Sequence, residues 1–258
     1  MPMPRTRRLT PGGLIYHVLN RANARLKNFS GRPDYEEFVQ AMHESLEHVP
    51  IRVLSWCLMP DHWHLVLWPR REGELSEFMR RLSVTHTRRW HARRHSSGSG
   101  HLYQGRYRSF PVEPDAHLLD VCKYVEGNPT RAGSVKKAID WPWSSVHERN
   151  GKPKHDGKSL GVATGGIERP ELSDWPIEIP RGWAARVDAA IGDAELAALR
   201  KSVQRGTPFG SLEWQAKIAR RLHLESTMRP RGRPRKNPLP EADKVAPAKP
   251  SRKPTARR

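Results

Sequence analysis

Residues 56–67 of the 258-residue chain, WCLMPDHWHLVL, contain two apolar runs separated by the turn-forming pair Pro60-Asp61. This pattern predicts two strands, at 51–58 and 62–68, joined in a tight hairpin. Side chains alternate between the two faces of a strand, so His62 and His64 point to one face and Trp63 points to the other. Two imidazoles on one rigid face can hold a divalent metal ion, although ordinary histidines bonded to their neighbours would produce the same pattern.

Strands and helices are predicted to alternate around this hairpin. Apolar alternation predicts strands within 12–21 and 103–112, and helical spacing of apolar residues predicts helices over 34–48, 74–95 and 114–127. This order predicts an α+β fold of ferredoxin-like type, an antiparallel sheet with packed helices. Two further short helices, over 193–204 and 211–224, would form a small helical C-terminal extension.

The charge of the chain indicates a polyanionic partner. The formal net charge is +19, and nucleic acid is the first candidate for such a partner. Residues 229–258 hold 11 lysines and arginines against 2 acidic residues, a net charge of +9, with seven prolines and no aromatic residue. We expect this tail to be disordered. No apolar run approaches the roughly 18 residues of a membrane span, so no membrane partner is expected.

Composition also predicts the division of the chain. We expect a basic arm at 1–11, the main domain at 12–150, a linker at 151–192, a helical accessory segment at 193–228 and the basic tail at 229–258. The accessory segment could form a small DNA-binding unit of its own. Cys57 and Cys122 are the two cysteines, and both lie in apolar surroundings. They are predicted to be buried free thiols in a reducing compartment.

The helix over 114–127 supplies candidates for a third ligand and a nucleophile. Two histidines with one oxygen ligand and open positions suit Mg²⁺ or Mn²⁺ acting on a phosphate. Asn128 could give that oxygen, and Tyr124 lies on the same face one helical turn earlier. A phenol beside a metal-bound phosphate can attack phosphorus. Alternatively, Tyr124 is an ordinary boundary residue and Asn128 ends the helix before Pro129.

Several motifs occur in order along residues 10–150: YHVLNR at 16–21, LMPDHWHL at 58–65, QGRY at 104–107, YVEGNPTRAG at 124–133 and WPWSS at 141–145. Together they resemble the single-tyrosine His-hydrophobic-His (HUH) transposases of bacterial insertion sequences, and among these the REP-associated tyrosine transposases. Residues 206–236 resemble an extension found in one REP-associated subgroup.

The resemblance implies roles for four residues. His62, His64 and Asn128 would be metal ligands, and Tyr124 would be the nucleophile. Family members cleave single-stranded, hairpin-forming DNA through a 5′-phosphotyrosine link that leaves a free 3′-OH. Family members often work as dimers, so a homodimer is possible here, and we expect a bacterial cytoplasmic protein associated with the nucleoid. Asp61, where asparagine is expected to be commoner, departs from the family pattern, and we expect it not to touch the chemistry.

Basic and aromatic residues give the predicted DNA surface, and two of them lie in the tail. An RGRP unit at 231–234 resembles an AT-hook core, which enters the minor groove of duplex DNA. The alternative for the tail is a generic basic segment bound through counterion release. The predicted DNA-binding residues are Arg21, Arg106, Tyr107, Arg108, Arg131, Arg231 and Arg233.

Two other functions fit the same sequence. A nucleic-acid-binding regulator could use this fold without catalysis. A metal-dependent phosphohydrolase without a covalent step would be indifferent to the identity of residue 124. The complete set of His62, His64, Tyr124 and Asn128 favours the transposase.

Overall fold

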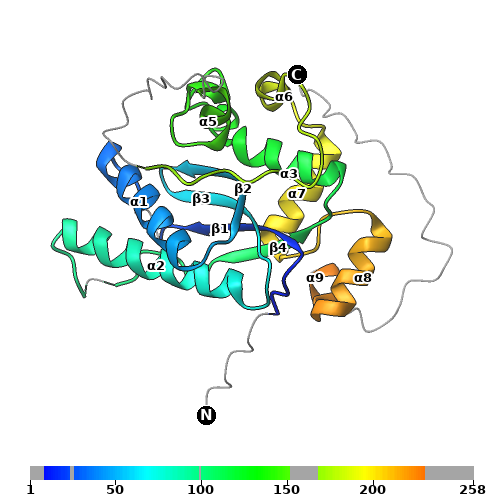
Figure 1. The fold of residues 1–258 in the computed structure, drawn as a ribbon, viewed down its shortest axis with the longest axis horizontal. Helices are drawn as coiled ribbons and strands as arrows, with labels where there is room; N and C mark the ends of the chain where they lie inside the picture. Colours follow the sequence, from blue (N-terminus) through cyan, green and yellow to red (C-terminus); the bar gives the residue numbers. More distant parts are fainter. Residues whose placement is uncertain (1–8, 24–25, 99, 152–167, 230–258) are drawn as a thin grey trace, which may run out of the picture. The chain divides into compact units, whose positions relative to one another are not determined.

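A computed structural model describes residues 9–23, 26–98, 100–151 and 168–229 of the protein (Figure 1). Arg231, Arg233 and the rest of the predicted tail beyond Arg229 lie outside the described residues. So do most of the predicted basic arm and the first part of the predicted linker.

Four antiparallel strands form one sheet in the order β2-β3-β1-β4 (Figure 1). Strands β2 and β3 are the predicted hairpin, and β1 pairs with the other edge of β3, which places Leu19 opposite His64. Along the chain the elements run βαββαβ, which confirms the ferredoxin-like α+β prediction. The strands are β1 (Ile15–Arg21), β2 (Arg52–Met59), β3 (His62–Trp68) and β4 (Arg108–Val112).

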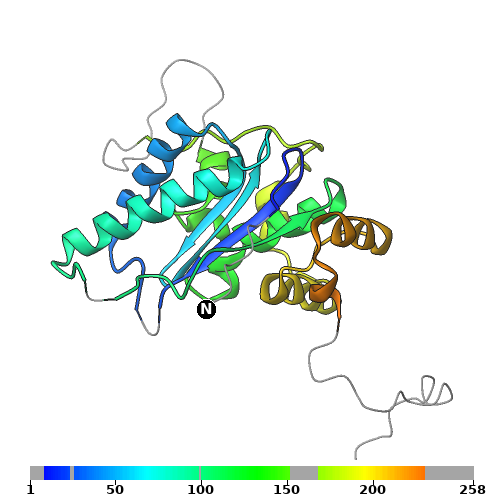
Figure 2. The ribbon, with the colours of Figure 1, turned by 90° about the horizontal axis from the view of Figure 1, so that it is seen from below.

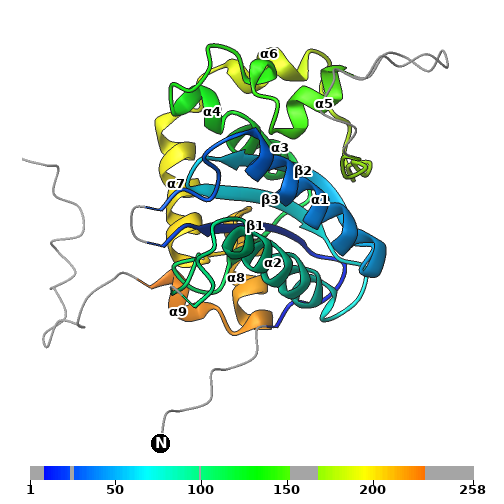
Figure 3. The same cartoon turned by 90° about the vertical axis from the view of Figure 1, so that its left-hand side faces the viewer.

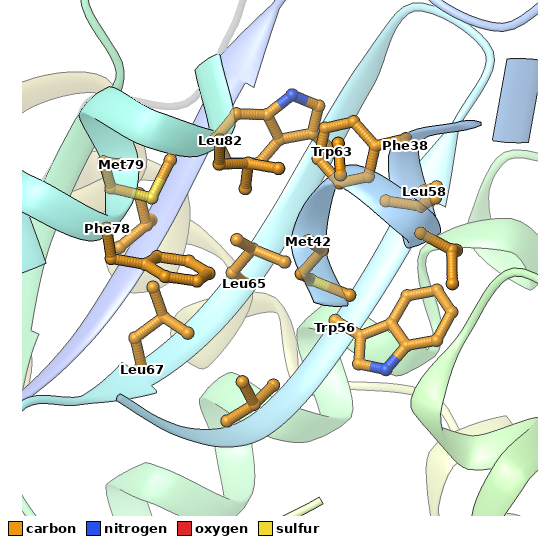
Figure 4. Close-up of a cluster of buried hydrophobic side chains, with 14 of the residues drawn as sticks. Phe38, Met42, Trp56, Leu58, Trp63, Leu65, Leu67, Phe78, Met79 and Leu82 are labelled. Atoms are coloured by element: carbon orange, nitrogen blue, oxygen red, sulfur yellow. The ribbon is translucent and has the colours of Figure 1, made fainter. Parts of the chain in front are cut away.

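Two long helices, α1 (Arg32–His48) and α2 (Glu74–Arg93), cover one face of the sheet (Figures 1 and 2). Between them and the strands lies an apolar core, part of which Figure 4 shows. Removing these side chains from water is the main force that holds the helices on the sheet. Its labelled members are Phe38, Met42, Trp56, Leu58, Trp63, Leu65, Leu67, Phe78, Met79 and Leu82.

The opposite face of the sheet carries α3 (Ala116–Glu126) and a set of shorter helices (Figures 1 and 3). Cys57 of β2 and Cys122 of α3 are fully buried free thiols on this face, as predicted. The shorter helices are α4 (Asn128–Arg131), the 3₁₀ turn η1 (Ala138–Asp140), α5 (Ser145–Gly151) and α6 (Trp183–Asp188).

A buried carboxylate joins three of these elements. Glu126, at the end of α3, accepts hydrogen bonds from the Ser55 hydroxyl of β2 at 3.1 Å and from the Trp183 indole of α6 at 2.5 Å. Arg149 of α5 lies 3.4 Å from the same carboxylate. Because a buried charge is tolerated only when it is bonded and paired, this cluster fixes the end of α3 with respect to β2.

The C-terminal part of the chain contains α7 (Asp193–Arg205), α8 (Leu212–Leu222) and α9 (Glu225–Met228), which confirms the two helices predicted there. Contacts join the chain up to Met228 into one unit. The predicted linker also packs in its described part, since the Trp175 indole donates to the Leu54 carbonyl of β2 at 2.8 Å. Trp175 and Trp183 are buried, so this segment adds to the core instead of spacing two bodies apart.

The strand predicted over 103–112 is shorter in the structure. Only Arg108–Val112 forms a strand, and the preceding residues turn across the end of β1, where the Gln104 amide donates to the Arg21 carbonyl. Tyr103 forms an isolated antiparallel bridge with Ala22, and its hydroxyl accepts from the Trp63 indole at 3.0 Å on the face covered by α1 and α2. The ladder between β1 and β4 begins at Leu19 and Arg108, so residues 103–107 lie outside β4.

Candidate active site

Strand β3 presents its histidines to the face that carries α3. Trp63 and Leu65 belong to the core beneath α1 and α2, and Val66 belongs to the core beneath α3. By alternation His62 and His64 therefore point toward α3. Their ring centroids lie 5.0 Å apart with the planes nearly perpendicular.

His64 is held by a third histidine that the sequence analysis did not select. His17 of β1 places Nε2 at 2.8 Å from His64 Nδ1, and both side chains are buried. Burial lowers the pKa of His17 to about 3 and the pKa of His64 well below its usual value, so both rings are neutral. When His64 Nδ1 donates its proton to His17, the Nε2 lone pair of His64 is left for a ligand.

His62 is oriented by Asp61, which corrects the expectation that Asp61 stays out of the site. The ring Nδ1 lies 2.6 Å from Asp61 Oδ1, while Arg21 donates to Asp61 Oδ2 at 2.6 Å. The hydrogen bond from His62 and the charge of Arg21 hold the pKa of Asp61 well below its usual range. With Nδ1–H bonded to this carboxylate, the Nε2 atom of His62 is the free ligand position, as in carboxylate–histidine–metal arrangements.

Tyr124 and Asn128 face these histidines from the end of α3 and the start of α4. Asn128 lies 3.1 Å from His62 Nε2 through its side-chain amide. The ring of Tyr124 meets the ring of His64 edge-on, with 5.8 Å between centroids. The structure thus brings together the four residues predicted for the reaction.

Gly127 allows the turn between Tyr124 and Asn128 to pack closely against α6. A Cβ atom added at Gly127 would lie 2.9 Å from the Lys123 carbonyl oxygen and 3.1 Å from that of Val187. The first separation is shorter than real Cβ contacts and the second is tighter than most of them, so a side chain here would displace the turn. The spacing of nucleophile and third ligand therefore depends on a glycine.

Arg131 covers the exposed side of the nucleophile. Its guanidinium carbon lies 4.3 Å from the centre of the Tyr124 ring, and the same guanidinium donates to the Tyr124 backbone carbonyl. A cation stacked on a phenol is attracted to the ring face and lies close enough to meet a phosphate there. Arg131 was predicted to bind DNA, and its position beside the phenol suits that role.

Tyr124 opens into a basic cleft of about 560 Å³. Three arginines that the sequence analysis assigned to DNA binding line it, namely Arg21, Arg106 and Arg108. A fourth, Arg200, comes from α7 and was not predicted. Arginine clusters of this kind bind phosphates.

Tyr107 lies apart from this cleft. It lines a second cavity of about 470 Å³ against α2, together with Met79, Arg80 and Val84. Residues Asn20, Gly105 and Arg106 border both cavities. Of the predicted DNA-binding residues that the structure describes, Tyr107 is therefore on the side away from Tyr124.

Another group of metal-ligand types lies at the start of α3. Glu113, Asp115 and His117 have ligand atoms within 4.8 Å of one another, the one cluster of three His, Cys, Asp or Glu residues in the described parts of the chain. Asp115 caps α3 by accepting from the His117 amide at 2.9 Å, and Glu113 accepts from the Ser211 amide at 2.6 Å. These hydrogen bonds give the acidic groups a structural role.

Comparison with known proteins shows which family part of the chain resembles. Residues 12–128 match the family described as "Transposase IS200 like". None of the described helices is long and apolar enough to cross a membrane. Residues 12–128 are therefore similar to IS200-like transposases, and this similarity covers less than half of the chain.

Individual relatives of the chain carry a more specific description. A Haemophilus influenzae protein, "Putative REP-associated tyrosine transposase", is 28% identical over 151 residues, which are 55% of this chain and 84% of the relative. The REP-associated tyrosine transposase of Escherichia coli is 24% identical over 138 residues, 53% of this chain and 78% of the relative. The chain is thus similar to REP-associated tyrosine transposases over about half its length.

Solved structures also resemble the chain. One is described as "Structure of the REP associates tyrosine transposase bound to a REP hairpin". It aligns with a TM-score of 0.43 and 20% identity and covers 67% of this chain and 96% of its own.

Three residues of the site were not predicted from the sequence to have a function. His17 was quoted within a motif but given no role, although its place on a strand that pairs with β3 was a usable signal. Asp61 was noted only as a departure from the family, although its position next to His62 was visible. Arg200 carries no signal of its own, because its helix looks like any exposed amphipathic helix.

Proposed function

We propose that the protein is a metal-dependent enzyme that cleaves single-stranded DNA and transfers the strand through a covalent 5′-phosphotyrosine intermediate. One observation carries this proposal: Tyr124 projects into an arginine-lined cleft while His62, His64 and Asn128 meet beside it. The similarity to REP-associated transposases supports hairpin-forming DNA of the REP type as the substrate.

The donor set fits Mg²⁺ or Mn²⁺. Asp61 and His17 each occupy the Nδ1 atom of one histidine, which leaves both Nε2 atoms as ligands. The Asn128 amide already meets His62 Nε2 at 3.1 Å, and a half-turn of this amide presents its oxygen to the same point. Two imidazoles and one amide oxygen leave positions for a phosphate and water. When bound, the ion would polarise the phosphate and stabilise charge that builds up on its oxygens.

The chain's own groups then carry the reaction. The Tyr124 oxygen attacks the scissile phosphorus, the bond from phosphorus to the 3′-oxygen breaks, and the phenol proton is lost as the 3′-oxygen gains one. Arg131 and the cleft arginines bind the phosphate oxygens and orient the strand. The phosphotyrosine keeps the bond energy for rejoining to another 3′-OH.

Three further properties go with this function. We propose that the enzyme acts as a homodimer and works in the cytoplasm close to the nucleoid. We also propose that Arg231 and Arg233, which lie outside the described residues, add duplex DNA contacts.

The decisive experiment measures covalent attachment. The protein is incubated with end-labelled single-stranded hairpin DNA and Mn²⁺, and the mixture is run on a denaturing protein gel. Wild type should give a labelled adduct, and Tyr124→Phe should give none while binding DNA normally. Tyr107→Phe is the matched control, because this tyrosine faces the other cavity, and it should still form the adduct.

Two outcomes would replace the proposal by its alternatives. DNA cleavage that survives Tyr124→Phe would identify a phosphohydrolase without a covalent step. Binding without cleavage or adduct would identify a DNA-binding regulator on the same fold.

A further inference from the structure

Helix α7 lies beyond the part of the chain that matches the transposase family, yet it borders the Tyr124 cleft. The family match ends at residue 128, whereas α7 begins at Asp193. Arg200, Val203 and Gln204 of this helix line the cleft opposite Asn20 and the 104–106 loop. The C-terminal segment therefore builds a wall of the candidate active site.

This wall is anchored to the core. Leu199 is fully buried in the core beneath the α3 face, and Ser202 is also buried. Because these two residues fix the inner side of α7, Arg200 and Gln204 are presented on its outer side, where both are exposed.

Contacts at both ends of α7 fix its position along the cleft. Before the helix, Lys123 of α3 donates to the Ala190 carbonyl at 3.0 Å. After the helix, Phe209 pairs with the edge of β4: its amide donates to Pro111 and its carbonyl accepts from Glu113, both at 2.9 Å. A helix held at both ends and along one side is a preorganised binding surface.

The charges on the two sides of the cleft have the same sign. Arg200 lines the same cleft as Arg21, Arg106 and Arg108. Arg131 is also near enough for its positive charge and that of Arg200 to repel each other. No described acidic residue lies within ion-pair distance of Arg200. Like charges repel unless an anion lies between them, so this geometry fits a DNA phosphate.

We propose that α7 forms the second wall of the single-strand cleft and that Arg200 binds a phosphate of the strand held against Tyr124. This inference rests on the proposed function for the identity of the strand. It makes residues 193–205 part of the catalytic unit, where the sequence indicated an accessory segment. Bidentate pairing of a guanidinium with a phosphate is the chemistry involved.

The test compares two cations on the same helix. Arg200→Gln and Lys201→Gln each remove one positive charge from α7, but Lys201 is exposed and does not line the cleft. Binding of fluorescein-labelled oligothymidylate by the full-length protein is followed by anisotropy in EDTA, which prevents cleavage. The titration is repeated at several salt concentrations.

Arg200→Gln should weaken binding about tenfold, because it removes a charge-assisted hydrogen bond. It should also reduce the slope of log affinity against log salt by about 0.7, the value for one lost phosphate contact on a single strand. Lys201→Gln should change neither quantity. Arg200→Lys should keep the slope but lose part of the affinity, because an ammonium pairs with one oxygen at a time.

Equal affinities and slopes for Arg200→Gln and Lys201→Gln would overturn the inference, provided that both variants melt like wild type. The adduct assay keeps this failure separate from that of the proposed function. If wild type forms the adduct but Arg200→Gln binds DNA like wild type, only the proposed role of α7 in binding is wrong. An Arg200 effect without any adduct keeps the binding wall and removes the covalent chemistry.

Discussion

On the face covered by α1 and α2, strand β3 presents Trp63, Leu65 and Leu67 to a continuous apolar core. On the face covered by α3, the same strand presents His62 and His64 before it returns to an apolar residue at Val66. The first face is closed by two long helices, and the second by α3 and several short segments. One strand thus supplies stability through one set of side chains and chemistry through the other.

The difference lies in how polar groups are held. On the α3 face each histidine is bonded by a neighbour, His64 by His17 and His62 by Asp61. On the other face His86 is also buried, but it bonds the Tyr103 hydroxyl within an aromatic cluster. A buried histidine can therefore serve packing or a site, and its partners decide which.

The largest effect should come from removing the core side of β3. Trp63→Ala deletes a fully buried ring that also bonds Tyr103, and it should lower the free energy of unfolding by about 3–5 kcal/mol. His62→Ala, one residue away and partly exposed, should lower it by less than about 1 kcal/mol. Urea unfolding of both variants in EDTA measures the contrast.

Equal losses of unfolding free energy in Trp63→Ala and His62→Ala would contradict this difference between the two faces. The two free energies can be compared only if both variants have the same m-value, the slope of the free energy of unfolding against urea concentration. This slope reports the surface exposed on unfolding. The DNA cleavage assay should give the opposite ranking: His62→Ala loses activity by removing a proposed ligand. Trp63→Ala should retain activity at temperatures where it stays folded.

The next effect concerns the partner of His64. His17→Phe keeps an aromatic ring beside Phe110, whose centroid lies 4.7 Å from that of His17, but removes the nitrogen that fixes His64. Loss of such a supporting bond should weaken Mn²⁺ binding by about 10- to 100-fold. The measurement is the free Mn²⁺ signal in electron paramagnetic resonance titrations.

His86→Phe is the matched control, because it replaces a buried histidine on the face away from the site. Its Mn²⁺ affinity should equal that of wild type. Were His17→Phe also to bind Mn²⁺ like wild type, His17 would be a packing residue and the two faces would not differ in this respect.

The effect that is smallest over a single pH unit is a pH dependence of stability from the α1/α2 face. Burial lowers the pKa of His86 to about 3, whereas a histidine in the unfolded chain titrates near 6.5. Between these values the unfolded state binds a proton that the folded state does not. Stability contributed by neutral His86 is therefore complete above about pH 6.5 and is lost as the pH falls toward 3, by about 1 kcal/mol per pH unit.

Urea unfolding of wild type and His86→Phe between these pH values checks this sign. The variant should lose stability less steeply on acidification. A parallel loss in both proteins would mean that His86 is protonated in the fold or stays accessible to solvent.

Sequence patterns predicted most of the fold because they depend on neighbouring residues. Alternation gave β1, β2 and β3, and helical spacing gave α1, α2, α3, α7 and α8 with ends displaced by a few residues. The strand predicted at 103–112 is wrong in its first half, where Tyr103 makes an isolated bridge to Ala22 and its hydroxyl bonds Trp63, 40 positions away. The predicted linker failed in its described part because Trp175 and Trp183 bury themselves in the α3 face.

The sequence by itself determined that His62 and His64 share one face of a strand and that Tyr124 and Asn128 lie about one helical turn apart. Both facts follow from backbone periods of two and about 3.6 residues. Only the tertiary structure decided that these pairs meet, that His17 and Asp61 hold the histidines, and that Arg200 lines the Tyr124 cleft. Those contacts join residues far apart along the chain, and the burial of apolar surface on both sheet faces, not a local period, selects them.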